Sequence, residues 1–132
     1  MGVSTNAILA FGFDLGEDLP EAWANEEGFE FTEWAEKKAG MEWSADDKDF
    51  WKKRDAMLAG LPATLVTHCS EECPMYFLAL PGSVTSAHRG TPIPVAATGE
   101  PSGRQLIAMR KFCDDLGIQW KEPAWHIFSY WG

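Results

Sequence analysis

Ala7-Ile8-Leu9-Ala10-Phe11-Gly12-Phe13, near the start of the chain, is a continuous apolar run that Asp14 and Gly16 end. A short run without polar alternation is typical of a strand that is buried on both faces of a sheet. Residues 75–80 form a second run of this kind, and Pro81-Gly82 ends it. The two runs therefore predict the central strands of a sheet.

Further strands are predicted on either side of the second run. Residues 63–69 are rich in Thr and Val, residues 83–87 are compatible with a short strand, and residues 125–131 alternate in part. The segment 70–74 between two of these strands carries turn residues, including Pro74.

Three helices are predicted from capping and stop residues. Thr32 is the expected N-cap of a helix over residues 33–39, which Gly40 ends. Ser44 is the expected cap of a second helix, which Gly60 ends; its apolar stripe is Phe50, Trp51, Met57 and Leu58. Ser102 and Gln105 form a capping box for a third helix, which ends at Gly117.

The order of these elements predicts one domain, residues 1–132, of the α/β (α+β) class. We expect a mainly antiparallel sheet with helices on one face and a tendency toward the ferredoxin-like, or split βαβ, plan, whose first and third strands are central. Because both central runs are apolar on both faces, the second face of the sheet also needs a cover. The acidic, aromatic-rich segment 14–43 or a partner could supply it.

Charge is distributed unevenly along the chain, whose net charge is −9. Nine acidic side chains and no basic one lie between Asp14 and Glu36. Direct binding to nucleic acid or to an anionic membrane is not expected, since both need a basic surface. A protein partner with a basic surface fits this segment, whereas a solvated acidic face that keeps the chain soluble is the alternative.

Aromatic residues are also frequent, with seven Trp and eight Phe. Trp is enriched at the energetic centres of protein interfaces. We therefore predict a partner-binding surface made of Glu26, Glu27, Glu30, Trp23 and Trp34. The competing interpretation places these rings in the core.

The cysteines and histidines leave a metal site open as an alternative. His68, Cys69 and Cys73 are potential ligands within six residues, but no second paired motif accompanies them. We therefore expect no zinc and no other cofactor. The odd count of three Cys and the absence of a basic segment before the first apolar run favour a reducing cytoplasm.

A second alternative is a small-ligand or nucleotide-sequestering site, in which His88, Arg89 and Arg104 would meet a phosphate. No phosphate loop, zinc-protease helix or nucleophile elbow is present in the sequence. A catalytic role is left undecided, with a non-enzymatic role preferred, and the oligomeric state is left open.

Three segments together resemble small hypothetical proteins of tailed bacteriophages. They are Ile8–Phe13, His68-Cys69-Ser70 continuing through residues 74–79, and Ser129-Tyr130-Trp131-Gly132. The resemblance implies expression in the cytoplasm of a bacterial host and brings no site residues with it. By analogy with such proteins, we expect an accessory protein that binds and inhibits a host protein, such as a defence factor or a nucleic-acid-binding protein.

Overall fold

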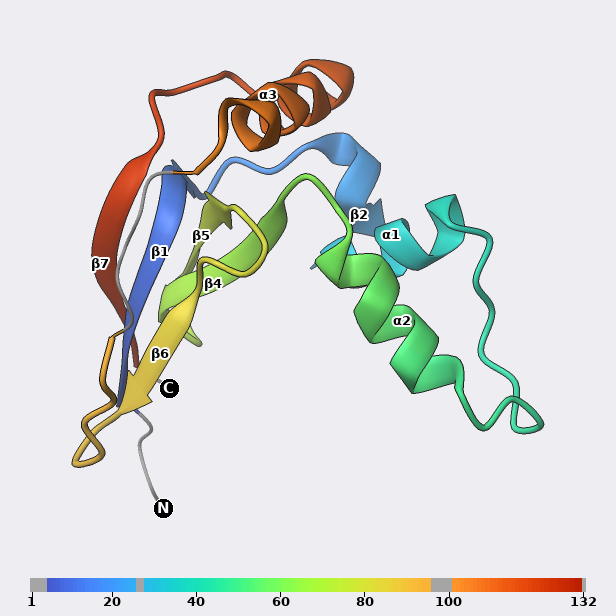
Figure 1. Cartoon of the computed structure of the whole chain (residues 1–132), viewed down its shortest axis with the longest axis horizontal. Coiled ribbons are helices and arrows are strands. Elements are labelled where there is room, and N and C mark those ends of the chain that lie inside the picture. Colours follow the sequence, from blue (N-terminus) through green and yellow to red (C-terminus); the bar gives the residue numbers. More distant parts are fainter. Residues whose placement is uncertain (1–4, 26–27, 96–100, 132) are drawn as a thin grey trace.

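The structure is a computed structural model that describes residues 5–25, 28–95 and 101–131. Its elements are, in chain order, β1 (Thr5–Gly16), the 3-10 helix η1 (Glu21–Trp23), β2 (Ala24–Asn25), β3 (Gly28–Phe29), α1 (Phe31–Lys38), α2 (Phe50–Ala59), β4 (Thr64–Ser70), β5 (Pro74–Ala79), β6 (Thr85–His88), α3 (Gly103–Leu116) and β7 (Ala124–Trp131). The described part of the chain is thus an α+β fold with a five-stranded mixed sheet (Figure 1).

Strand β1 is the centre of the sheet. One of its edges pairs antiparallel with β7 along Thr5–Gly12, and the other pairs first with β6 and then with β5. Strand β4 pairs antiparallel with β5, and its last residues, Cys69 and Ser70, meet Tyr130 and Trp131 of β7 in parallel. Both predicted central runs therefore have strand neighbours on two sides, and the sheet curls until β4 and β7 touch.

Gly12 lies where β1 changes partners. It is paired with Ala124 of β7 on one side and with Ala79 of β5 on the other. Gly12 is paired with Ala79 of β5, and Leu9, three residues earlier in β1, is paired with Thr85 of β6. Because Ala79 and Thr85 are six residues apart in the sequence, the residues around Pro81-Gly82-Ser83 form an insertion between β5 and β6. The Ser83 hydroxyl donates to the carbonyl of Leu80, and its oxygen accepts from the amide of Phe11, which ties this insertion to β1.

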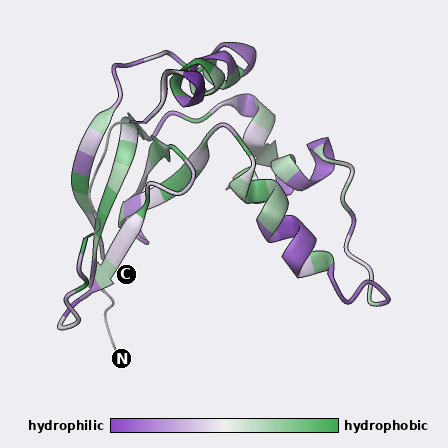
Figure 2. Ribbon diagram, viewed as in Figure 1, coloured by the Kyte–Doolittle hydropathy of each residue, from purple (hydrophilic) through white to green (hydrophobic). Residues whose placement is uncertain are grey.

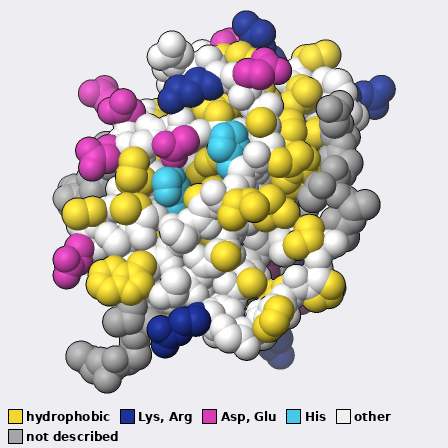
Figure 3. Space-filling view, turned by 90° about the vertical axis from the view of Figure 1, so that its left-hand side faces the viewer, with side chains coloured by type: hydrophobic (Ala, Val, Ile, Leu, Met, Phe, Trp, Pro, Cys, Tyr) yellow, Lys and Arg dark blue, Asp and Glu magenta, His cyan; other side chains and the backbone are white. Residues whose placement is uncertain are grey.

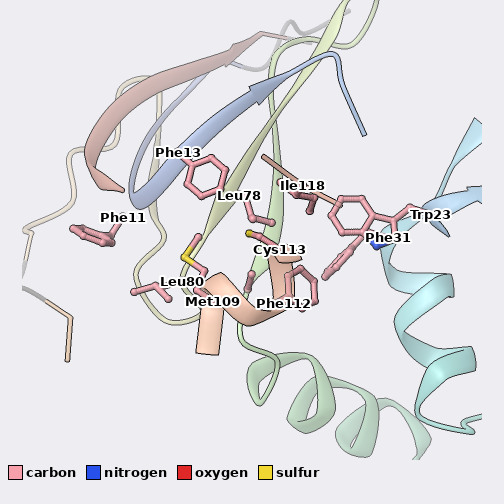
Figure 4. Packing of buried hydrophobic residues seen from close by; sticks show 11 residues of the cluster. Phe11, Phe13, Trp23, Phe31, Leu78, Leu80, Met109, Phe112, Cys113 and Ile118 are labelled. Atoms are coloured by element: carbon pink, nitrogen blue, oxygen red, sulfur yellow. The ribbon is translucent and has the colours of Figure 1, made fainter. Parts of the chain in front are cut away.

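The main core lies between the sheet and the helices (Figure 4). Alternate residues of β1 and β5 point toward α3, whose own buried side chains complete the packing. The buried members are Phe11, Phe13, Trp23, Phe31, Ala63, Leu78, Leu80, Met109, Phe112, Cys113 and Ile118. Helix α3 begins with the predicted capping box and ends at Gly117, which has a left-handed conformation.

The opposite face of the sheet carries a smaller cluster of Ala10, Phe77 and Ala79, with Val66 and Phe128 packed against it. The segment 14–43 does not cover this face, because Trp23 and Phe31 belong to the main core on the helix side. Instead, the curl of the sheet brings Phe128 of β7 to 4.6 Å from Phe77 of β5, measured between ring centroids. The sheet thus covers much of this face with its own side chains.

Several predicted elements are confirmed with shifted boundaries, and one helix start is wrong. The antiparallel neighbours β7–β1, β1–β5 and β5–β4 agree with the split βαβ plan, but β6 and the β4–β7 contact are not part of it, so the ferredoxin-like arrangement is not confirmed. Helix α2 begins at Phe50 rather than after Ser44, since the Ser44 hydroxyl accepts from the Asp46 amide within a turn. Within the described residues, no helix is long and apolar enough to cross a membrane.

Candidate functional site

The acidic segment and the helices after it form a helical lobe, defined as η1, α1, α2 and the residues that connect them (17–59). The lobe lies on one side of the sheet, and β7 forms the opposite margin of the molecule (Figure 1). Figure 2 shows hydrophobic colour along β1 and hydrophilic colour over much of α2 and the loop before it. Of the predicted partner-binding residues, Trp23, Glu30 and Trp34 belong to this lobe.

Trp23 is a core residue of the lobe rather than a free surface anchor. Its side chain is 1% exposed, and its ring centroid lies 5.0 Å from that of Phe31 and 6.4 Å from that of Phe112. Trp34 is half-buried against the same rings and carries the ammonium group of Lys38 at 5.0 Å from its centroid. The competing interpretation, in which aromatic residues of the acidic segment build the core, therefore holds for Trp23.

The three predicted glutamates have different places. Glu30 is exposed and caps α1, because its carboxylate accepts from the Thr32 amide at 3.2 Å. Glu26 and Glu27 lie outside the described residues. The expected cap of this helix, Thr32, is instead a residue of its first turn.

A groove runs beside α1, next to the chain that leaves η1. It has a volume of about 310 Å³ and is bordered by Glu30, Glu33, Lys37 and Lys38, with Trp34 also in its wall. Lys37 and Glu33 form an ion pair of 3.0 Å across one turn of α1. Carboxylate and ammonium groups thus both border the groove.

The most exposed aromatic rings of the lobe lie further along the chain. Trp43, in the loop before α2, is 62% exposed, and Trp51, in the first turn of α2, is 59% exposed. Phe50 is 3% exposed, so α2 turns Phe50 toward the protein and Trp51 toward solvent. The predicted apolar stripe that included Trp51 is therefore wrong at this position. Phe50 and Trp51 lie about 100° apart around the helix axis, and the narrow buried side of α2 includes only Phe50.

Charged side chains of both signs lie near these two rings in the sequence: Lys48 and Lys52 are exposed, and the guanidinium group of Arg54 lies 5.5 Å from the ring centroid of Trp51. Glu42, Asp46, Asp49 and Asp55 are all exposed. Some acidic residues of the lobe are neutralised internally: Glu36 pairs with Arg54, and Asp47 pairs with Lys53 at 3.3 Å. Glu17, Asp18 and Glu21 are exposed and form no ion pair within the described residues. The lobe thus carries two solvent-facing indoles and, at Glu17, Asp18 and Glu21, carboxylates that have no ion-pair partner among the described residues.

The residues of the alternative phosphate site are not brought together. His88 and Arg89 line a cavity at the end of β6, whereas Arg104 lines another, between α3 and the segment after α2. A single phosphate that contacts both arginines is not compatible with this arrangement.

The residues of the alternative metal site have separate environments. His68 lies on the sheet face opposite the helices, where its Nε2 is 2.8 Å from a carboxylate oxygen of Asp14 and its ring packs on Phe128. Cys69 and Cys73 are exposed, and Cys69 has a left-handed backbone conformation. Within the described residues, no group of three or more His, Cys, Asp or Glu side chains is placed to hold a metal ion. Burial, with a smaller contribution from Asp114, raises the pKa of the third thiol, Cys113, to about 11, which keeps it protonated and unreactive at neutral pH.

Comparison with known proteins finds no matching family model, no similar curated protein and no similar solved structure.

Proposed function

We propose that this protein binds another protein that has a basic surface, and that the helical lobe makes the contact. The single observation that carries the proposal is the pair of solvent-facing indoles, Trp43 and Trp51, on a lobe that also exposes the carboxylates of Glu17, Asp18 and Glu21. Large exposed rings cost free energy in water, and Trp is the residue type most enriched at interface hot spots. Exposed carboxylates on the same lobe speed association with a basic partner and select against acidic ones.

The proposed partner is a host protein, in line with the resemblance to small bacteriophage proteins. Inhibition of a defence factor or of a nucleic-acid-binding protein, in the cytoplasm of a bacterial host, belongs to the same proposal. A nucleic-acid-binding protein is a suitable class, because its own ligand is a polyanion and its binding surface is basic. The ferredoxin-like plan is proposed as the architectural relationship of the sheet, with β6 as an added strand.

The anchors are tested by capturing partners from host lysate with the purified protein and measuring affinity for whatever is retained. Trp43→Ala combined with Trp51→Ala is expected to weaken binding roughly 30-fold or more, the size expected for loss of hot-spot residues. Ile107→Ala is the matched control, because Ile107 is 73% exposed on α3, outside the lobe, and it is expected to bind as the unmodified protein does. Equal binding by the tryptophan variant and the control contradicts the proposal.

The contribution of charge is tested with Glu17→Lys combined with Glu21→Lys. These side chains are exposed and form no ion pair among the described residues, so the fold is expected to tolerate the change. Glu30 is unsuitable, because its substitution also removes the cap of α1. We expect slower association with the partner and little change in dissociation, since rim charges act mainly on the association rate.

A further inference from the structure

Among the strands that the structure describes, β7 has one edge that is largely without a strand partner. Its pairing with β1 runs from Ala124 to Trp131, but its pairing with β4 includes only Tyr130 and Trp131. The backbone of residues 124–129 on the side away from β1 therefore forms no ladder with another described strand. We call this side of the strand the β7 edge; in Figure 1 it lies at the margin of the molecule, away from the helical lobe.

The sequence of β7 lacks the residues that usually prevent a strand edge from joining another strand. The sequence of the strand, Ala-Trp-His-Ile-Phe-Ser-Tyr-Trp, contains no Lys, Arg, Asp, Glu, Pro or Gly. Soluble proteins usually block a free strand edge with a charge, a proline, a bulge or a covering loop. A free edge of this length and composition is thus suited to accept another strand.

Side chains beside this edge are also suited to a contact. Ile127 is 80% exposed and Trp131 is 56% exposed, and both project from the same face of β7 because they are an even number of residues apart. Figure 3 shows the side of the molecule that carries β7: hydrophobic, histidine and uncharged atoms fill most of its centre, and the Lys, Arg, Asp and Glu side chains lie mainly toward the rim.

We infer that the β7 edge is a homodimer interface, in which two copies of the chain join their β7 strands antiparallel about a two-fold axis. A two-fold axis perpendicular to the sheet at Ile127 places Ile127 opposite its own copy and His126 opposite Phe128, so that no like charges face each other. Two chains of net charge −9 repel each other over most of their surfaces. The uncharged β7 edge is where a second copy can approach at the lowest electrostatic cost.

Sedimentation equilibrium of the purified protein, over about a hundredfold range of concentration, tests the dimer by mass action. Ile127→Lys places two ammonium groups on the two-fold axis and is expected to raise the dissociation constant by roughly tenfold or more. Ile107→Lys adds the same charge at a similarly exposed site on α3 and is expected to leave the dimer intact. A monomer at every concentration, or equal effects of the two variants, overturns the inference.

Covalent trapping gives a second readout. In a background with Cys69→Ser and Cys73→Ser, Ile127→Cys is expected to form a disulfide-linked dimer when the oxidant diamide is added, because residues facing each other in antiparallel strands have Cα atoms about 4.5–5.5 Å apart, within the range of a disulfide. Ile107→Cys in the same background is expected to remain monomeric. Cross-linking of both variants to the same extent contradicts a specific β7 contact. Neither experiment involves the proposed host partner, so a failure here leaves the proposed function standing.

Discussion

At Gly12 the backbones of β1 and β5 approach too closely for any side chain. A Cβ atom at this position would lie 1.9 Å from the carbonyl oxygen of Leu78 and 2.9 Å from the Cα of Ala79, and both are backbone atoms that cannot rotate away. We predict that Gly12→Ala lowers the free energy of unfolding by about 3 kcal/mol or more, as severe overpacking does. Urea denaturation followed by tryptophan fluorescence measures this change.

The control is Gly103→Ala, since a Cβ at Gly103 meets nothing within 4 Å and this residue begins α3. Alanine has the higher helix propensity, so stability is expected to stay the same or to rise by up to about 1 kcal/mol. If both alanine variants were equally stable, the close approach of β1 to β5 would be disproved.

Single residues also show what the sequence can and cannot predict about the site. The enrichment of acidic and aromatic side chains predicts a surface at residues 14–36, but it does not show which rings are exposed. Trp23 and Trp51 are the same residue type near similar carboxylates, and one is buried whereas the other faces solvent. Trp51 faces solvent because α2 is oriented with Phe50 toward the protein. Trp23 is buried in part by contact with Phe112 of α3, about ninety residues further along the chain. Local sequence carries no information on such a contact.

At the scale of elements, the strands were predicted better than the helices of the lobe. The continuous apolar runs of β1 and β5 indicate buried strands because they are short and end at turn residues, whereas a buried helix needs a longer run. The start of α2 was missed because Ser44, Asp46 and Asp47 favour both helix caps and turns. Here they form turns: Ser44 accepts from Asp46, and Asp47 accepts from the Asp49 amide. The α3 capping box was unambiguous, since both of its reciprocal hydrogen bonds form.

Helix α2 is the least anchored helix of the described fold, and this predicts its behaviour. Phe50 is its only buried residue, whereas α3 buries Met109, Phe112 and Cys113. Its ion pair between Arg54 and Glu36 is partly exposed and adds little. We predict that the amides of α2 exchange with deuterium at least about tenfold faster than those of α3, because local opening exposes less apolar surface. Hydrogen-exchange mass spectrometry measures both helices in one experiment, and equal protection would contradict this prediction.

At the scale of the whole molecule, the covering of the second sheet face was the least predictable feature. Apolar residues on both faces of β1 and β5 required a cover, and the expected covers were the acidic segment or a partner. The curl of the sheet brings Phe128 over Phe77 instead, through pairings between segments far apart in sequence. The described part of this segment that follows Gly16 is thereby left on the helix side, where Glu17, Asp18 and Glu21 face solvent.

Unbalanced charge in the lobe leads to a prediction for the whole molecule. The segment from Asp14 to Glu36 contains nine acidic residues and no basic one, and the net charge of the chain is −9. These negative charges repel each other in the folded state, and the repulsion is weaker in the expanded unfolded chain. Sodium chloride screens this repulsion, with a Debye length of about 10 Å at 0.1 M. We therefore predict that the thermal midpoint rises with added sodium chloride. Sodium chloride is preferable to a sulfate salt, because sulfate also strengthens apolar burial.

The variant that carries Glu17→Lys and Glu21→Lys separates this effect from general salt effects. It changes the net charge from −9 to −5, since each substitution removes one negative charge and adds one positive charge. Repulsion within the lobe is then weaker, so the thermal midpoint at low salt is expected to be higher and its rise with salt smaller. Differential scanning calorimetry of both proteins across the same salt series compares the slopes. Parallel slopes would show that the carboxylates are too far apart, or too well hydrated, to destabilise the fold, and that their one-signed charge matters only in contact with a partner.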